Sequence, residues 1–515
     1  MALPDPGDWP VKDPVSEPAG DLLRERTGST PDRLAVVDAD TGERWTFGEF
    51  DDRVSRRVER LEGRFGAADG RVGVMLDAGV AFADLYFATE RRGATAVPLN
   101  VELPADTLRA QAERAGLDLL VCERDTEGLA TSVAPDGVPV ASVDEPASSA
   151  VESLSLARTA ATPPFETPLD ADRLVLFTSG TTGEPKGVRL TRCNLVASAV
   201  GSADRLGVDP ADRWLVCLPM YHMGGLAPLV RSTLYGTTTV LQRSFDAGET
   251  AAAMAEYGVT GVSLVPTMLR RLLDAGWTPP DSLRFVLLGG GPASEDLLAR
   301  AADRGVPVYP TYGATETASQ VATATPSEAR EYTGTVGRPL STVEVSVRDD
   351  GSAVPRGERG EVVVAGPTVV PGYLDAERTA AAFGPAGFHT GDVGYRDEGG
   401  RLWVVGRLDD RIVTGGENVQ PARVVDALRG VDGVADAAVV GLPDEQWGER
   451  VTALVVPAAD LTPEAVRAGV RERLADYAVP KTVGFADALP RTPSGTVDRE
   501  AVAERLRDAG DGPPE

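Results

Sequence analysis

The chain has 515 residues, of which 42% are hydrophobic, so it is long enough for two or more folded domains. Its formal net charge of −27 excludes a net basic surface of the kind that nucleic acid requires. No run approaches the roughly 18 apolar residues that span a bilayer, and the first ten residues lack the basic and apolar regions of a secretory signal. These features predict a cytoplasmic protein without stable membrane insertion.

The charged residues are unusual in kind as well as in number. Only Lys12, Lys186 and Lys481 are lysines among 51 basic residues, and 78 acidic residues are spread along the chain. An acidic surface could serve a basic partner, but dispersed acid with almost no lysine is typical of a cytoplasm rich in salt, so we interpret the source as a halophile. The three cysteines lie far apart without metal-ligand spacing, which favours reduced thiols.

Residues 1–170 alternate between helical and strand patterns. Apolar residues at positions 50, 54, 58 and 61 follow helical spacing and predict a helix over 47–61. Further elements are expected as a helix over 82–92 and as strands over 71–76, 93–99 and 119–122. This βαβ rhythm predicts a parallel sheet with helical cover, while 123–170 is expected to be largely loop with short strands.

The segment 178–187 reads TSGTTGEPKG and follows an apolar run over 174–177 that has the pattern of a buried strand. Such a loop exposes backbone N–H groups and hydroxyls, and glycine lets the chain come close to a ligand. With the charge of Lys186, this composition suits a polyphosphate, although it does not match the G-x-x-x-x-G-K-[ST] pattern. A polar surface loop is the alternative interpretation.

Later strands end in turns that contain glycine or proline. The turns at 219–225, 289–292 and 312–317 read PMYHMGG, GGGP and YGATET, and each follows a predicted strand. Because ligands bind at the carboxyl ends of strands in open α/β sheets, these turns and the 178–187 loop predict one shared site.

The pattern changes after residue 333, where short β segments with frequent Gly and Pro run to 406. We place a domain boundary at Asp409, which divides the chain into 1–408 and 409–515. The second part is expected to be a small α+β domain with strands at 436–440 and 452–456 and a helix over 463–474.

Taken together, these residues resemble the adenylate-forming superfamily of acyl-CoA synthetases, firefly luciferases and nonribosomal peptide adenylation domains. The matching segments occur in the family's order and cover most of the chain, at 178–187, 312–317, 390–392, 406–410 and 493–495. The resemblance implies an α/β fold with two sheet subdomains and a β-barrel-like subdomain in the N-terminal domain. It also implies a mobile C-terminal lid that rotates about Asp409 as a hinge.

The resemblance implies a two-step reaction. A carboxylate attacks the α-phosphate of ATP to give acyl-AMP and pyrophosphate, and the thiol of coenzyme A then attacks the acyl-AMP. The first step depends on positioning and charge neutralisation, for which Mg²⁺ is the expected cofactor. The expected partners are therefore ATP, a carboxylic acid and coenzyme A; the oligomeric state is left open, with a homodimer as one option.

The same resemblance assigns roles to residues of this sequence. The β- and γ-phosphates are expected to be bound by Thr178, Ser179, Gly180, Thr181, Thr182, Gly183 and Lys186. The rest of the nucleotide is expected to lie against Gly289, Gly290, Gly291, Tyr312, Gly313, Thr315, Asp392 and Arg407. The metal ligand is Glu316, and the catalytic residues are Lys186, Thr315, Glu316 and His222. The tunnel for coenzyme A is assigned to Gly415, Gly416, Glu417 and Trp447.

Several of these residues have ordinary structural alternatives. Glu316 could cap a helix and Asp392 could simply form a turn. Tyr312 and Trp447 could be core residues, and Arg407 could form a surface ion pair. The ordered set of motifs favours the functional interpretation of all five.

One position departs from the family pattern. The family places a lysine after the glycine of Pro-x-x-x-x-Gly, where it bridges the carboxylate and the α-phosphate, and this chain has Thr496 there. Threonine carries no charge and cannot neutralise the developing negative charge. Either Arg491, Arg499 or Lys481 substitutes, or the first step is slow, or this position was altered; the sequence leaves these alternatives open.

The acyl pocket is expected near His222, Gly290, Ser319 and Gln320. The turn after strand 214–218 has no acidic residue, which argues against amino-acid substrates. Segments 287–294 and 311–320 resemble o-succinylbenzoate–CoA ligases of menaquinone synthesis, which implies 2-succinylbenzoate as the acid. The alternatives are another aryl- or medium-chain acyl-CoA ligase, or an acyl-adenylate-binding protein whose adenylation is impaired by Thr496.

Overall fold

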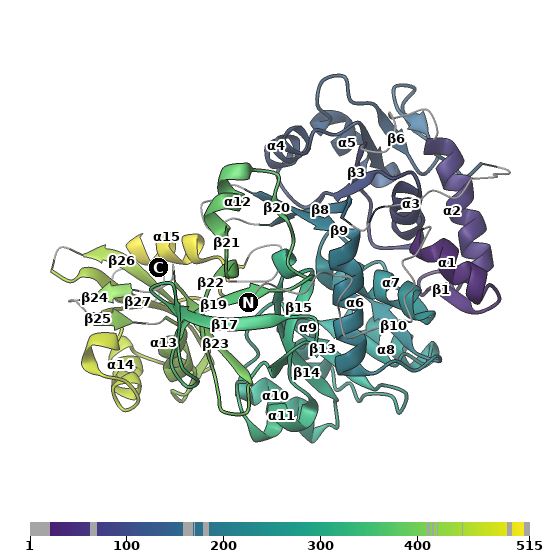
Figure 1. The fold of residues 1–515 in the computed structure, drawn as a ribbon. Coiled ribbons are helices and arrows are strands. Elements are labelled where there is room, and N and C mark those ends of the chain that lie inside the picture. Colours follow the sequence, from purple (N-terminus) through teal and green to yellow (C-terminus); the bar gives the residue numbers. More distant parts are fainter. Residues whose placement is uncertain are drawn as a thin grey trace. The chain divides into compact units, whose positions relative to one another are not determined.

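The computed structural model describes residues 21–61, 70–157, 168, 170–178, 185–408, 412–414, 417–419, 421–444, 446–491 and 497–508. It is a mixed α/β protein (Figure 1). The chain divides into two compact units, one of Met1–Val345 with Val363–His389 and one of Ser346–Val362 with Thr390–Glu515. The predicted boundary residue Asp409 lies outside the described residues, so the division at 408/409 stays a prediction.

The first unit contains an eight-stranded sheet with the order β20-β9-β8-β4-β3-β5-β6-β7. Its strands are β3 (Arg71–Met75), β4 (Thr95–Pro98), β5 (Leu119–Cys122), β6 (Val140–Ser142), β7 (Glu152–Ser153), β8 (Asp172–Thr178), β9 (Lys186–Thr191) and β20 (Gly372–Tyr373). The strands from β8 to β7 in this order pair in parallel, whereas β9 pairs antiparallel with both β8 and β20. The predicted parallel sheet is confirmed.

Helices between these strands are α2 (Phe47–Leu61), α3 (Val80–Arg91), α4 (Ala105–Ala115) and α5 (Glu127–Val133). The amphipathic pattern over 47–61 gave the bounds of α2 correctly, because Phe50, Val54, Val58 and Leu61 all face the core. The expectation that 123–170 is largely loop was wrong for α5. That helix is only seven residues long and too short to show a clear period.

A nine-stranded sheet follows in the same unit, with the order β16-β15-β14-β13-β12-β10-β11-β1-β2. Its strands are β1 (Leu34–Asp38), β2 (Arg44–Thr46), β10 (Arg213–Val216), β11 (Thr238–Leu241), β12 (Gly261–Leu264), β13 (Phe285–Leu288), β14 (Val308–Ala314), β15 (Ser319–Thr323) and β16 (Arg338–Pro339). The strands from β14 to β1 pair in parallel, and β15, β16 and β2 add antiparallel edges. The carboxyl ends of the parallel strands therefore share one edge.

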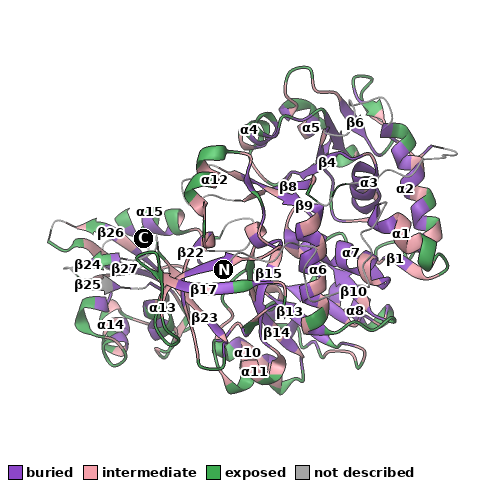
Figure 2. Cartoon of the chain, in the orientation of Figure 1, coloured by how far each residue is buried: buried purple, intermediate pink, exposed green. Residues whose placement is uncertain are grey.

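The helices of this part of the unit are α1 (Leu22–Ser29), α6 (Arg192–Leu206), α7 (Met223–Tyr235), α8 (Ala247–Glu256), α9 (Pro266–Asp274), α10 (Glu295–Asp303), α11 (Pro326–Glu331) and α12 (Ala376–Ala382). Thr191 caps α6 as expected, because its side chain accepts from the backbone N–H of Asn194. Buried residues of α3 and α7 belong to one continuous apolar core, and both helices are largely purple in Figure 2.

A six-stranded sheet has the order β18-β17-β19-β22-β21, and β23 pairs with β22. Its strands are β17 (Glu344–Asp349), β18 (Ser352–Ala353), β19 (Gly360–Ala365), β21 (Phe383–Gly384), β22 (Gly387–Arg396) and β23 (Leu402–Arg407). These short β segments fall in the region where the sequence predicted them.

The C-terminal part of the second unit is built on a five-stranded sheet of order β25-β24-β27-β26, with β28 beside β27. The strands are β24 (Ile412–Thr414), β25 (Glu417–Val419), β26 (Val434–Asp444), β27 (Gly448–Pro457) and β28 (Thr482–Phe485), with helices α13 (Pro421–Arg429), α14 (Pro463–Arg471) and α15 (Arg499–Asp508). The predicted small α+β domain is confirmed. Across the described part of the chain, we find no helix that combines the length and apolar character of a membrane span.

Candidate active site

Glu316 lies in a single 3₁₀ turn, Thr315–Thr317, between the antiparallel strands β14 and β15. Its backbone oxygen accepts from Val370 N over 3.0 Å, and its Oε1 accepts from Tyr373 Oη over 2.9 Å. Both donors come from the segment that leads into and forms β20. A half-buried carboxylate with one oxygen oriented in this way is a suitable ligand for a hard cation such as Mg²⁺.

Lys186 is close to the same tyrosine. Its Nζ lies 5.5 Å from the centroid of the Tyr373 ring, and Tyr373 in turn holds Glu316. Thr178 and Lys186 are cross-strand partners at the end of β8 and the start of β9. The predicted loop residues 179–183 lie outside the described residues. The structure thus brings Lys186 and Glu316 together through Tyr373, a residue that no sequence motif singles out.

The turn after Glu316 has an uncommon backbone. Ala318 has a φ of 51° and Ser319 a φ of 109°, both in the region that side chains with a Cβ rarely adopt. A Cβ on Gly313 would lie 1.6 Å from the carbonyl oxygen of Ser319, so only glycine fits there. Ser198 Oγ, from the buried face of α6, donates to the Ala318 carbonyl over 2.6 Å.

The three glycines after β13 lie where the sequence predicted, at the carboxyl end of a parallel strand next to β14. A Cβ on Gly289 would meet Thr311 Cγ2 at 2.8 Å, and Gly290 has a φ of +76°. Gly291 faces open space. Because Thr311 precedes Tyr312 directly, the structure brings the glycine turn and the half-buried Tyr312 to neighbouring strand ends. A flat ring could approach the backbone here because none of the three glycines carries a side chain.

Residues predicted for the acyl pocket lie directly before α7, after β13 and at the start of β15. His222 is the residue before α7, its ring contacts that of Tyr221 at 4.8 Å, and burial lowers its pKa, which favours the neutral imidazole. Gln320 is 1% exposed and donates from Nε2 to Thr323 Oγ1 over 2.8 Å. Its Oε1 has no hydrogen-bond partner among the described residues.

Arg231 is a buried charge that sequence reasoning missed. It lies on α7, is 2% exposed, and donates from one terminal nitrogen to Ser198 Oγ over 3.1 Å. Its guanidinium carbon lies 5.6 Å from the centroid of the Trp214 ring, and burial lowers its pKa to about 10. No carboxylate within the described ranges forms a salt bridge with it, and its Nε has no hydrogen-bond acceptor there. The signal in the sequence is a single arginine in the otherwise uncharged segment 223–235.

In the second unit, Asp392 and Arg407 face each other across β22 and β23. They are cross-strand partners, and Arg407 donates to Asp392 Oδ1 over 3.0 Å. The N–H of Asp392 is held by Thr390 Oγ1, and Gly391 turns the chain with a φ of 71°. The expected ribose-binding pair therefore exists as a pair, and the interpretation of Arg407 as an ion-pair residue is also correct.

Trp447 is not a core residue, because 36% of its surface is exposed. Lys481 Nζ lies 5.0 Å from the centroid of its ring. Glu417, at the start of β25, is exposed, whereas Gly415 and Gly416 lie outside the described residues. The assignment of these residues to a coenzyme A tunnel stays a prediction.

Three basic residues are candidates to substitute for the missing lysine. Arg491 donates to Asp436 Oδ2 over 3.0 Å, and Lys481 contacts Trp447. Arg499, the first residue of α15, has a pKa lowered by burial and then by the nearby charge of Arg407. Arg499 is thus the candidate that lies near a predicted nucleotide-binding residue. Thr496 itself is outside the described residues.

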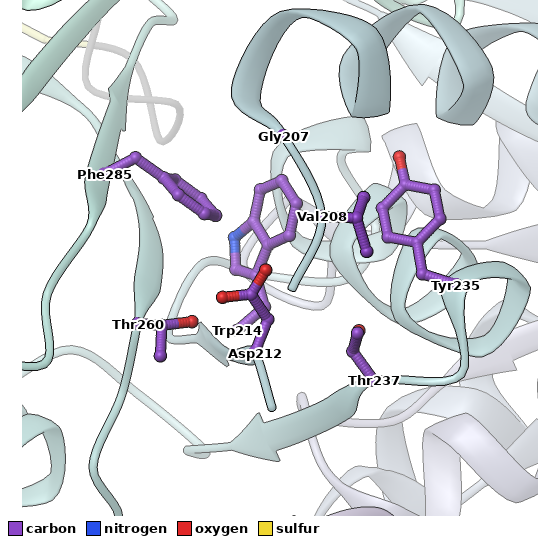
Figure 3. Close-up of a pocket in the computed structure, with 8 residues that line it drawn as sticks. All are labelled: Gly207, Val208, Asp212, Trp214, Tyr235, Thr237, Thr260 and Phe285. Carbon is purple, nitrogen blue, oxygen red and sulfur yellow. The ribbon is translucent and has the colours of Figure 1, made fainter. Parts of the chain in front are cut away.

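A separate small pocket lies at the amino ends of the parallel strands of the nine-stranded sheet (Figure 3). It is lined by Gly207, Val208, Asp212, Trp214, Tyr235, Thr237, Thr260 and Phe285. None of these is a predicted site residue, and the carboxylate of Asp212 is already paired with Arg284. This pocket is distinct from the strand ends that carry the candidate active site.

Comparison with protein families identifies the two parts of the chain. The AMP-binding enzyme family matches residues 23–374, and the AMP-binding enzyme C-terminal domain matches residues 426–496. A 2-succinylbenzoate–CoA ligase from Bacillus cereus (strain AH820) is 38% identical over 490 residues, which is 94% of this chain and 98% of that relative. The Bacillus mycoides enzyme of the same name is 38% identical over 489 residues, with the same shares covered.

Solved structures agree with the sequence relatives. An o-succinylbenzoate CoA synthetase from Bacillus subtilis in complex with its acyl-adenylate intermediate has a TM-score of 0.87 and 33% identity, covering 96% of this chain and 99% of that one. The same enzyme with ATP and magnesium ion has a TM-score of 0.86 and 33% identity, covering 95% and 99%. The expected fold, a large N-terminal domain followed by a small C-terminal domain, is confirmed, and this chain belongs to the AMP-binding enzyme family.

Proposed function

We propose that this chain is an ATP- and Mg²⁺-dependent acid–CoA ligase that converts 2-succinylbenzoate to 2-succinylbenzoyl-CoA in menaquinone biosynthesis. The observation that carries the proposal is the similarity, over 94% of the chain, to ligases of that name. A neighbour that holds the acyl-adenylate supports the order of steps, with acyl-AMP formed first and the thioester second.

Residues of the first unit bind the phosphates in this proposal. Lys186 neutralises charge on the β- and γ-phosphates, Thr178 and residues 179–183 bind the same phosphates through uncharged polar groups, and Thr315 contacts the α-phosphate. Glu316 holds Mg²⁺, which supplies further charge neutralisation when bound, and Tyr373 orients the carboxylate for it. Because phosphoryl transfer needs little covalent help from the protein, such positioning is the main catalytic contribution.

The residues proposed to bind the nucleoside are those that the family resemblance assigned to it. Gly289, Gly290 and Gly291 lie along the adenine, Tyr312 stacks on it, and Gly313 keeps the adjoining turn narrow. The pair of Asp392 and Arg407 binds the ribose hydroxyls, and the ion pair between them orients the carboxylate for this contact.

The acid is recognised between α7 and β15. His222, Gly290, Ser319 and Gln320 line this pocket, and the neutral imidazole of His222 can pack against an aromatic acid. Arg231 adds a buried positive charge without a carboxylate partner among the described residues, and burial has already lowered its pKa. A second carboxylate on the substrate would offset the desolvation cost of this buried charge. This favours a dicarboxylic acid such as 2-succinylbenzoate over benzoate or octanoate.

Coenzyme A is proposed to enter along Gly415, Gly416 and Glu417 and to pack against the exposed face of Trp447. The reaction is placed in the cytoplasm, with the three cysteines as free thiols. Rotation of the lid about Asp409 between the two steps stays part of this proposal.

A panel of acids in high salt tests the proposal. Pyrophosphate release and thioester formation are measured with 2-succinylbenzoate, benzoate and octanoate, each with and without coenzyme A and Mg²⁺. We expect release with 2-succinylbenzoate that depends on Mg²⁺, and a thioester only when coenzyme A is present. Release with benzoate or octanoate alone identifies a different acyl-CoA ligase. Tight ATP binding without release for any acid identifies an adenylate-binding protein, the alternative that Thr496 favours.

A further inference from the structure

Ser198 joins two parts of the candidate site with one hydroxyl. It lies on α6, is 2% exposed, donates to the Ala318 carbonyl over 2.6 Å and accepts from Arg231 over 3.1 Å. A hydroxyl has one donor and two acceptor positions, so it makes both bonds at once. The three residues are distant in the sequence, and each comes from a different element: α6, α7 and the turn before β15.

The hydrogen bond from Ser198 to the Ala318 carbonyl stabilises a turn with an uncommon backbone conformation. Ala318 and Ser319 both have positive φ, and such conformations persist only where the surroundings hold them. The Ala318 N–H donates to the Thr315 carbonyl over 3.0 Å, so the turn is continuous with the one that carries Glu316. Ser198 therefore fixes the far end of the metal-binding turn, while Tyr373 fixes the carboxylate.

The hydrogen bond that Arg231 donates to Ser198 strengthens the bond from Ser198 to Ala318. A donor charge on one side of a hydroxyl polarises it and makes it a better donor on the other side. The guanidinium is buried and no described carboxylate competes for it, so its effect on Ser198 is little screened. A carboxylate that binds Arg231 would change this polarisation. It would thereby change the strength of the hydrogen bond from Ser198 to the Ala318 carbonyl.

We propose that Ser198 is a positioning residue that couples Arg231, and hence the second carboxylate of the acid, to the turn that holds Mg²⁺ through Glu316. The part that concerns the acid rests on the proposed function, whereas the link from Ser198 to the Glu316 turn does not. The two parts predict different measurable effects.

Three variants test the link: Ser198→Ala, Ser198→Thr and Ser232→Ala. Ser232, the neighbour of Arg231 on α7, is an equally buried serine whose Oγ has no hydrogen-bond partner among the described residues. Mg²⁺-dependent ATP binding is titrated without any acid. We expect Ser198→Ala to weaken the Mg²⁺ enhancement of ATP binding by about tenfold, and Ser198→Thr and Ser232→Ala to retain it. If Ser198→Ala lowers only the Tm and binds Mg·ATP like the wild type, Ser198 is merely structural and the proposal is overturned.

A double-mutant cycle tests the coupling to the acid. Ser198→Ala, Arg231→Met and the double variant are compared by KM for 2-succinylbenzoate and by kcat for pyrophosphate release. Non-additive effects of about fivefold or more on kcat support coupling through the hydroxyl, and additive effects refute it. If the wild type does not use 2-succinylbenzoate at all, the proposed substrate fails, while the Mg·ATP titration still decides the role of Ser198.

Discussion

Tyr373 Oη donates a hydrogen bond of 2.9 Å to Glu316 Oε1, across 57 residues of sequence. Tyr373 is 4% exposed, so its ring position is fixed by packing, and Lys186 Nζ lies 5.5 Å from the ring centroid. One aromatic side chain therefore sets the relative positions of the proposed metal ligand and the proposed phosphate-binding lysine.

Replacing Tyr373 by Phe should weaken Mg²⁺ dependence without destroying the fold. The ring and its contact with Lys186 are kept, but the carboxylate loses the donor that orients it. We expect the Mg²⁺ concentration for half-maximal pyrophosphate release to rise roughly fivefold to tenfold. Tyr395→Phe is the matched control, because the Tyr395 ring stacks on Trp403 at 5.2 Å and its hydroxyl lies in the other unit. An unchanged Mg²⁺ titration for Tyr373→Phe would show that Glu316 does not need this bond.

Replacing Arg231 by Met should change substrate choice more than stability. The methionine fills similar space and removes a buried charge that lacks a carboxylate partner among the described residues, so the Tm should hold or rise. KM for 2-succinylbenzoate should rise by about 10–100-fold, because the charge-assisted contact to the second carboxylate is lost. A monocarboxylic analogue that keeps the reacting carboxylate and lacks the second one is the internal control, since its kcat/KM should fall only by the smaller amount that loss of the Arg231–Ser198 bond causes. Equal losses for both acids would contradict the assignment.

The parts of the fold that the sequence predicted are those with local signals. Helix α2 follows from four apolar residues at helical spacing, and strand β5 follows from a short apolar run. Glu316, Lys186 and the glycine turn follow from motifs that are continuous in the sequence. The roles of Tyr373, Ser198 and Arg231 do not follow from such motifs. Their contacts join residues that are 57, 120 and 33 positions apart, respectively. A periodic pattern contains no information about contacts over such separations.

Replacing Gly313 by Ala should destabilise the first unit strongly. The added Cβ would lie 1.6 Å from the Ser319 carbonyl oxygen, which is backbone and cannot rotate away. The turn would have to move, at an expected cost of about 2–5 kcal/mol in the free energy of unfolding. Gly128→Ala, in helix α5, is the control because nothing lies within 4 Å of the new Cβ there. Denaturant unfolding in high salt measures both; a Gly313→Ala protein as stable as wild type would show that the turn relaxes freely.

The buried histidine should make stability depend on pH. Burial lowers the pKa of His222 below its value in the unfolded chain, so the unfolded state binds more protons as the pH falls. The stability contributed by the neutral ring is therefore present above about pH 6.5 and is lost as the pH falls through the lowered pKa. The free energy of unfolding of the wild type relative to His222→Gln should be smaller at pH 5 than at pH 8. A difference that is constant with pH would mean that the imidazole is not neutralised by burial.

Restoring a lysine at position 496 should separate the two half-reactions. Thr496 cannot neutralise the charge that develops at the α-phosphate, and Arg499, which lies near Arg407, is held at the start of α15 rather than at the family's lysine position. Thr496→Lys should therefore raise the rate of acyl-AMP formation by about tenfold or more, while the rate of thioester formation from preformed acyl-AMP stays the same. Arg499→Gln in the wild-type background should slow acyl-AMP formation if this arginine substitutes for the lysine, and its effect should shrink in the Thr496→Lys background. Single-turnover measurements of each half-reaction decide between these outcomes: no gain in the first step would mean that the charge at this position does not limit adenylation in this enzyme.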